Sequence, residues 1–208
     1  MAAIDTWASN FALFILPSSF LCSLLIFGPH STFCRYPDES GTVTETTPIT
    51  ETTPRTERLL KAEEIVTKAG GCVLRLAGLY ILTRGAHGFY FKAEKPIPGN
   101  PDGLVNQLHY DDAAGACLAA LEAGPAVCQG QIFLISDGQP LTRRQICQAA
   151  LQTAAYRGQS MPIFAADSDN SSDFSDKPGK RYDGSHSNQV LNWSPRYKSF
   201  DAFMQDNA

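Results

Sequence analysis

The sequence has no CxxC pair and no histidine spaced as a metal partner for a cysteine, which argues against a zinc site. Four of the six cysteines lie inside apolar segments, so we expect reduced, buried thiols and not a disulfide framework. We predict no metal site. The cysteines are Cys22, Cys34, Cys72, Cys117, Cys128 and Cys147.

The chain also has no block of like charge. Its formal net charge is −4, and lysine and arginine are spread along its length. This pattern gives no reason to expect binding of nucleic acid. The 208 residues are 43% hydrophobic and 18% charged, which is typical of one ordinary globular domain.

Basic residues are missing from the start of the chain, where the first one is Arg35. The apolar stretch there is interrupted at Pro17 and is shorter than the ~20 apolar residues of a membrane span. Secretory and organellar leaders carry basic residues that this stretch does not have. Residues 1–35 are therefore set apart, with three open interpretations: an anchor formed by residues 10–27, a poorly formed targeting segment, or sequence foreign to the fold. We expect a cytoplasmic location, with an organellar or membrane-associated one as the alternatives.

Apolar residues at helical spacing alternate with short apolar runs along the rest of the chain. We expect helices after Thr56, at residues 110–123 and at residues 141–156, and two short ones broken at Pro195. Thr56 is the expected cap of the first helix, Asp111 or Asp112 that of the second, and Thr142 with Gln145 forms a capping box for the third.

Two apolar runs rich in β-branched residues predict buried strands, at residues 72–80 and 131–136. A third strand is expected at Phe89–Phe91. Helices that alternate with buried strands indicate an α/β fold with a parallel sheet. Residues 166–180 contain almost no apolar side chain and predict a flexible loop.

Four segments carry a family resemblance by their order and spacing: CVLRLAGLY, LHYDDAAGACLAALEAG, QIFLISDGQPLTRRQICQAAL and LNWSPRYKSFDAF. Together they resemble the C-terminal half of the extended short-chain dehydrogenase/reductases, the NAD-dependent epimerase/dehydratase group, in an atypical form. The resemblance covers about residues 36–208. It implies a partial Rossmann-like parallel sheet with helices and a small C-terminal substrate-type lobe. It also implies that the N-terminal nucleotide-binding half is absent, in agreement with the small number of predicted strands.

NAD or NADP is the cofactor that this resemblance implies. A dinucleotide site needs a G-x-G-x-x-G loop between a strand and a helix, since only glycine lets the backbone approach the pyrophosphate. The sequence contains no such loop, and its adjacent glycines, Gly70 and Gly71, precede a strand. We therefore expect weak NAD(P) binding or none.

The family's acid/base pair, Tyr-x-x-x-Lys, lies on the helix that precedes the VLRLAG segment. Aligned on Glu63 or Glu64, the tyrosine position falls on Arg55 or Thr56. The lysine position falls on Leu59 or Leu60. Neither acid/base residue is present, so we predict no catalytic residue and leave open whether the chain is an enzyme.

Six residues correspond to positions near the family's ligands. Leu76, Gly78 and Leu79 match the segment beside the nicotinamide, although a buried strand that ends in a turn explains them as well. Arg84, Asn106 and His109 match positions that face the substrate, with a surface loop or a structural histidine as the alternatives.

Three functions remain open from the sequence. The resemblance implies an oxidoreductase-type epimerase or dehydratase, in a truncated chain, with a sugar- or nucleotide-type small molecule as its substrate. The second hypothesis is a non-catalytic scaffold or regulatory protein on the same fold. The third is a form of either that is tethered to a membrane by residues 10–27. The oligomeric state is not predicted.

Overall fold

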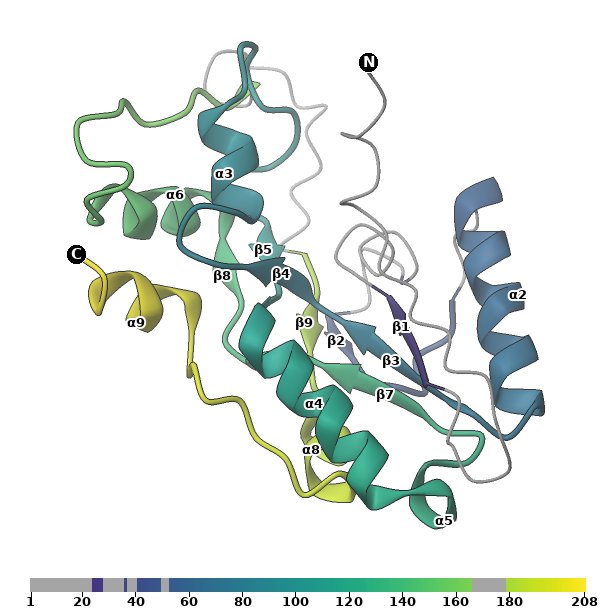
Figure 1. Cartoon of the computed structure of the whole chain (residues 1–208). Helices are drawn as coiled ribbons and strands as arrows, with labels where there is room; N and C mark the ends of the chain where they lie inside the picture. The colour runs from purple at the N-terminus through teal and green to yellow at the C-terminus, as the bar shows by residue number, and fades with distance from the viewer. Residues whose placement is uncertain (1–23, 28–35, 37–40, 50–52, 166–178) are drawn as a thin grey trace, which may run out of the picture.

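The computed structural model describes residues 24–27, 36, 41–49, 53–165 and 179–208. At its centre is a three-stranded parallel sheet with the order β1-β3-β7 (Figure 1). All five residues of the middle strand are buried, as a parallel strand covered on both faces should be. The strands span Leu24–Phe27 (β1), Cys72–Leu76 (β3) and Ile132–Ile135 (β7).

Three pairs of short strands accompany this sheet. They are β2 (Thr42–Val43) parallel to β9 (Arg181–Tyr182), β4 (Gly78–Tyr80) parallel to β6 (Gln107–His109), and β5 (Leu104–Val105) antiparallel to β8 (Leu141–Thr142).

The single strand predicted at residues 72–80 is in fact two strands, β3 and β4, because the chain changes partner at Ala77. The Ala77 N–H donates to the carbonyl of Ile135, at the end of β7, over 2.9 Å. The next N–H, of Gly78, donates to the carbonyl of Asn106, just before β6, also over 2.9 Å. The continuous apolar run shows burial correctly but contains no signal for this switch.

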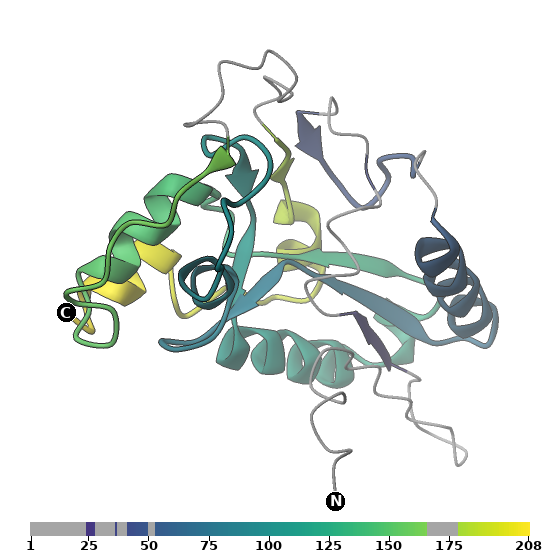
Figure 2. The same cartoon turned by 90° about the horizontal axis from the view of Figure 1, so that it is seen from above.

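The helices of the described residues pack around the sheet. Figure 2 shows α4 and α8 on opposite faces of it, with α2 beside β1 and β3. The helices are α2 (Pro54–Lys68), α3 (Ala86–Phe91), α4 (Tyr110–Ala123), α5 (Pro125–Cys128), α6 (Arg143–Leu151), α8 (Ser185–Val190) and α9 (Phe200–Gln205).

Helix caps follow the sequence in part. The capping box of Thr142 and Gln145 at the start of α6 is confirmed. Thr56 is not the cap of α2: Thr53 is, and Thr56 lies at the third helical position, where it completes a reciprocal box with Thr53. The cap of α4 is His109, the residue just before the helix, and not Asp111 or Asp112.

The strand predicted at Phe89–Phe91 is wrong, since these residues lie in helix α3. Aromatic content favours a strand, but Gly85 has a φ of 144°, which lets the chain turn into a helix directly after β4. Helix α3 then packs against α6. Phe91 contacts Tyr156 with ring centroids 4.9 Å apart, while Phe89 stays 66% exposed.

Two large hydrophobic clusters and a small one, of Val66 and Val73, make up the interior of the described residues. The first lies between the sheet and α4 and contains Leu74, Phe133 and Ala116. The second joins α3, α6 and α9 on the side of the molecule away from α2 and contains Tyr90, Ile146 and Met204 (Figure 1). This arrangement confirms the predicted α/β class, with a partial Rossmann-like sheet and a smaller lobe beside it.

Part of the apolar N-terminal segment belongs to the sheet. Within residues 1–35 the structure describes residues 24–27, which form β1 and pair in parallel with β3. The rest of the proposed anchor at residues 10–27 lies outside the described residues. Among the residues that are described, no helix has the length and apolar character needed to cross a membrane.

The predicted flexible loop at residues 166–180 also lies outside the described residues, except for its last two. Of these, Lys180 is buried, with an exposure of 7%, so the loop as predicted extends too far.

Candidate functional site

The carboxyl ends of β4 and β6 and the segment after β7 lie side by side. Tyr80 is the register partner of His109 in the parallel pair β4–β6. On the other side of β6, the Asp137 N–H donates to the carbonyl of Gln107 over 2.9 Å. Ligands of open α/β sheets bind beyond the carboxyl ends of the strands. We therefore take Tyr80, Arg84, Gln107, His109 and Asp137 as the candidate site and call it the strand-end site.

Arg84 is the exposed cation of this site. It follows β4 in a tight turn, in which the Ile81 N–H donates to the Arg84 carbonyl over 2.8 Å. The Arg84 guanidinium lies 5.8 Å from the ring centroid of Tyr110, the residue next to His109. The structure thus places Arg84 against the residue that follows His109 in the chain.

His109 acts as the cap of α4. Its Nδ1 accepts a hydrogen bond from the Asp111 N–H over 3.1 Å, so this nitrogen carries no proton. Burial lowers the pKa of His109, which favours the neutral ring that this bond requires. The ring packs against Tyr197 and Phe203, with centroids 4.0 and 4.8 Å away. These contacts give the side chain a structural role whether or not it also touches a ligand.

Asp112 is not part of an acid/base pair with Asp111. Its two carboxylate oxygens accept from the backbone N–H groups of Arg196 and Tyr197, over 2.7 and 3.0 Å. The carboxylate therefore binds the segment before α9 to the start of α4, and it is buried in doing so.

Sequence reasoning missed Asp137 and Tyr80. Asp137 is 7% exposed, and burial raises the pKa of its carboxyl to about 7. Burial and the charge of Asp137 likewise raise the pKa of the Tyr80 phenol. Near neutral pH the Asp137 carboxyl can thus both hold and release a proton. The position of an aspartate directly after the apolar run QIFLIS was a signal that could have identified it.

Three buried polar atoms at this site have no hydrogen-bond partner among the described residues. They are the Tyr80 hydroxyl, Asp137 Oδ2 and Gln107 Oε1. Leaving a buried polar atom unpaired costs about 1–3 kcal/mol. Such atoms are rare in folded proteins and require an explanation, such as a bound polar group.

The predicted cofactor residues present no polar side chain to a nucleotide. Leu76 and Leu79 are buried in the first hydrophobic cluster. At Gly78, a Cβ atom would lie 3.0 Å from the carbonyl oxygen of Asn106, so the close pairing of two strands already requires glycine there. Strand packing accounts for these three residues, and their cofactor role stays a prediction.

Asn106, the third predicted substrate residue, lies at the start of β6, away from Arg84 and His109 at its end. Its Nδ2 donates to the carbonyl of Lys180 over 2.8 Å, and its Oδ1 accepts from the Tyr182 N–H over 2.8 Å. Both ends of the amide thus bind the backbone at β9.

Asn106 belongs to a buried polar network that joins five parts of the chain: Tyr36, α2, β3, Asn106 itself and the segment at β9. The Lys180 ammonium donates to the carbonyl of Tyr36, and Arg75 donates to the Tyr36 hydroxyl over 2.7 Å. Arg75 also forms a two-point ion pair with Glu63 of α2, with distances of 2.7 and 3.2 Å. Burial acts to lower the pKa of Arg75, but its bonds to Glu63 and Tyr36 outweigh this effect and raise it.

We expect Asn106→Ala to lower the free energy of unfolding by about 3 kcal/mol, because it leaves two buried backbone groups unpaired. Denaturant unfolding of the variant, with the exposed Asn207→Ala as control, measures this change. A role in substrate binding alone would leave the unfolding midpoint where it is.

The acid/base positions predicted on α2 hold no titratable side chain at Thr56, Leu59 or Leu60. Thr56 is 3% exposed, and its hydroxyl is engaged in the capping box with Thr53. Leu59 packs under the helix against Val66 and Val73.

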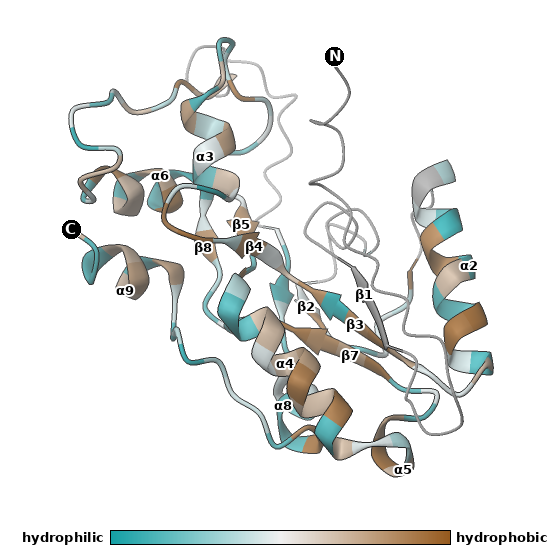
Figure 3. Cartoon of the chain, viewed as in Figure 1, coloured by the Kyte–Doolittle hydropathy of each residue, from teal (hydrophilic) through white to brown (hydrophobic). Residues whose placement is uncertain are grey.

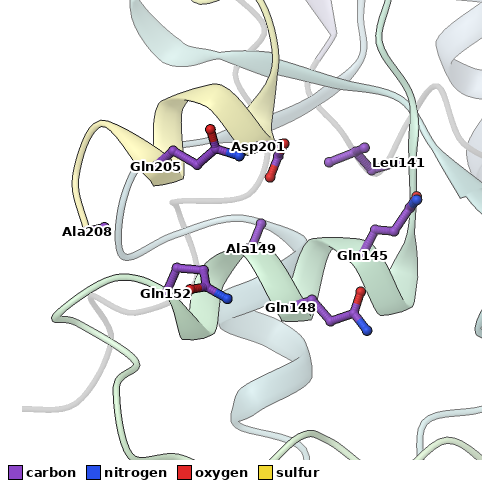
Figure 4. A pocket seen from close by; sticks show the side chains of 8 residues that line it. All are labelled: Leu141, Gln145, Gln148, Ala149, Gln152, Asp201, Gln205 and Ala208. Atoms are coloured by element: carbon purple, nitrogen blue, oxygen red, sulfur yellow. Dashed lines mark hydrogen bonds between the residues drawn. The ribbon is translucent and has the colours of Figure 1, made fainter.

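A groove of about 430 Å³ lies between α6 and α9, apart from the strand-end site (Figure 4). None of the cofactor or substrate residues predicted from the sequence lines this groove. Its lining consists of Leu141, Gln145, Gln148, Ala149, Gln152, Asp201, Gln205 and Ala208.

Comparison with solved structures identifies proteins of similar fold. No protein-family model and no curated protein matches the chain. Among solved structures, UDP-glucose 4-epimerase from Thermotoga maritima, with UDP-glucose, aligns with a TM-score of 0.64 at 17% identity, over 88% of this chain and 62% of that one. UDP-glucuronic acid 4-epimerase from Bacillus cereus, in complex with NAD, aligns with a TM-score of 0.65 at 19% identity, over 88% of this chain and 59% of that one.

dTDP-glucose 4,6-dehydratase from Bacillus anthracis, in complex with NAD, gives a TM-score of 0.60 at 15% identity, over 88% of this chain and 60% of that one. The resemblance to epimerases and dehydratases is therefore confirmed at the level of the fold, which is what identities this low can show. This chain spans about three fifths of the length of these three proteins.

Proposed function

We propose that this protein binds a sugar- or nucleotide-type small molecule at the strand-end site, as an epimerase/dehydratase-like protein without the Tyr-x-x-x-Lys pair. The observation that carries the proposal is that two buried polar atoms at the carboxyl ends of β4 and β7, the Tyr80 hydroxyl and Asp137 Oδ2, have no hydrogen-bond partner among the described residues, and neither has Gln107 Oε1 at the start of β6. The likeness to solved epimerases and dehydratases, some of them with sugar nucleotides, supports the same class of ligand.

The residues of the strand-end site have complementary roles in this proposal. Arg84 offers guanidinium donors to a phosphate or carboxylate, a geometry that suits planar two-point bonds. Its position over Tyr110 holds this cation at the rim. Asp137 and Tyr80 lie deeper and hold protons there, so they favour hydroxyl groups over charged ones.

NAD or NADP is the cofactor of the same proposal, bound weakly. The chain has no Gly-rich loop in its sequence, and Leu76, Gly78 and Leu79 are explained by strand packing. When bound, a nicotinamide would supply hydride transfer.

A second candidate is a non-catalytic scaffold or regulatory protein. It is favoured by one observation, the capping and packing roles of Thr56 and Leu59 where the family's acid/base pair would stand. On this hypothesis helix α2 packs against the sheet and supplies no catalytic residue.

A thermal-shift titration with UDP-glucose, NADH and NADPH tests the first proposal. We expect a saturable rise in the unfolding temperature with UDP-glucose, since a ligand at ~100 times its Kd adds about 2.7 kcal/mol of apparent stability. We expect little or no rise with either nicotinamide cofactor.

The matched variants are Arg84→Gln, which should weaken the UDP-glucose shift, and Arg157→Gln on another part of the surface, which should not. A cooperative unfolding transition that no ligand displaces would contradict small-molecule binding and favour the scaffold.

A further inference from the structure

The groove between α6 and α9 has the geometry of a second ligand site. Its volume of about 430 Å³ falls in the ~300–1,000 Å³ range of small-molecule pockets. Figure 4 shows that its two walls are the facing helices α6 and α9, with Ala149 between them. The apolar residues of its lining are Leu141, Ala149 and Ala208, of which Ala149 lies in the middle of the groove and Leu141 at one end (Figure 4).

One wall is a row of amides. Gln145, Gln148 and Gln152 are spaced three and four residues apart on α6, so they lie along one face of the helix. The Gln145 carbonyl oxygen accepts from the Thr142 N–H over 2.9 Å, which leaves its NH₂ group for a ligand. The side-chain amides of Gln148 and Gln152 form no hydrogen bond with another described residue, and both side chains are exposed.

The opposite wall is a fixed polar pair on α9. The Gln205 NH₂ group donates to Asp201 Oδ2 over 3.0 Å, which orients both side chains across the groove from the amides of α6. The second carboxylate oxygen of Asp201 remains an acceptor for a ligand, whereas the carbonyl oxygen of Gln205 points away from α6 in Figure 4.

The charge of the groove excludes an anionic ligand. Asp201 is the one charged side chain of its described lining. The two arginines at the start of α6 are engaged elsewhere: Arg143 donates to the Pro98 carbonyl over 2.8 Å, and Arg144 lies 3.5 Å from Asp102. A phosphate or a nucleotide would meet a carboxylate here without a compensating cation.

Metal binding is not favoured either, since no group of three His, Cys, Asp or Glu side chains gathers anywhere among the described residues.

We propose that this groove binds a neutral saccharide. A hydroxyl group both donates and accepts, and the amides of Gln148 and Gln152 offer both functions to it. The apolar strip of Leu141 and Ala149 can be covered by the C–H face of a sugar ring. Because the amides are exposed and exchange bonds with water, we expect a Kd of about 1 mM. The groove is separate from the strand-end site, so this inference does not depend on the proposed function.

An NMR titration of the full ¹⁵N-labelled chain with maltotriose tests the proposal, with inorganic phosphate as the anionic comparison. We expect maltotriose to shift the amide resonances of α6 and α9 and phosphate to leave them unchanged. The double variant Gln148→Ala/Gln152→Ala should bind maltotriose at least about tenfold more weakly, since it removes two of the amide partners. Alanine is the best helix former, so α6 should stay folded.

The control variant Gln129→Ala/Gln159→Ala removes two exposed glutamines outside the groove and should bind as the parent does. The proposal is overturned if maltotriose produces no shift, if its shifts map to the strand-end site, or if both double variants weaken binding equally. Equal binding of phosphate, or tighter binding of a polar peptide such as triserine, would overturn it as well.

Discussion

Raising the pH from 4 to 8 should lower the contribution of Asp137 to the free energy of unfolding by about 4 kcal/mol. The carboxyl has a pKa of about 7 in the folded protein, against an ordinary value of 3.8. Between these values the folded state holds a proton that the unfolded state has released. Stability from this group is therefore complete below pH 4 and is lost as the pH rises through 7.

The cause is a buried negative charge near other acidic groups. Burial is the largest influence on the Asp137 pKa, and the charge of Asp112 raises it further. Hydrogen bonds from the backbone of Gln139 and Phe200 act in the opposite direction without cancelling the burial. The phenol of Tyr80, which faces the same carboxyl, offers no positive charge.

The measurement is denaturant unfolding at several pH values for the parent and for Asp137→Asn. The buried histidines His87 and His109 have lowered pKa values, so they make stability rise with pH and partly mask the effect in the parent. The difference between parent and Asp137→Asn removes this contribution. The exposed Asp206→Asn is the control, and identical pH profiles for parent and Asp137→Asn would contradict the prediction.

Arg75→Met should lower the free energy of unfolding by about 3–5 kcal/mol. The substitution leaves the Glu63 carboxylate, whose side chain is 4% exposed, without its cation in the interior. It also removes the donor to the Tyr36 hydroxyl. The double variant Glu63→Leu/Arg75→Met should recover most of the loss, because it removes both charges and fills their space with apolar groups.

Denaturant unfolding at pH 7 measures the two variants. The matched control is Lys68→Met, which breaks an exposed ion pair on the same helix and should have no measurable effect. If Arg75→Met were no worse than this control, the ion pair would not be holding α2 to β3. A double variant as unstable as the single one would show that the network matters as a whole and not for its charge balance.

The features that could be predicted from the sequence are those that depend on residues close together in the chain. The capping box at Thr142 and the burial of the run at residues 72–80 follow from local spacing, and the structure has both. Arg75 was a missed signal: an arginine inside a fully buried strand requires a partner, and Figure 3 shows one hydrophilic stretch within the otherwise hydrophobic β3. A search for that partner would have led to Glu63 on the preceding helix.

The rest depends on contacts between distant residues. Tyr80 and His109 lie together because β4 pairs in parallel with β6, and that pairing needs the change of partner at Ala77. Asn106 takes its role from Lys180, 74 positions later in the chain. His109 is the cap in place of the expected aspartates, because its Nδ1 accepts from the Asp111 N–H, and the burial that favours its neutral ring comes from residues distant in the chain such as Tyr197 and Phe203.

The pairing of β2 with β9 constrains the order in which the protein can be made. The Arg181 N–H donates to the carbonyl of Gly41, 140 positions earlier, and the Lys180 ammonium donates to the carbonyl of Tyr36, 144 positions earlier. A ribosome releases the N-terminal side first, so β2 leaves it long before its partner is synthesised. During that interval its backbone N–H and C=O groups are open to other strands. Slow translation of the middle of the chain should therefore increase misassembly, and a chaperone that covers β2 should reduce it.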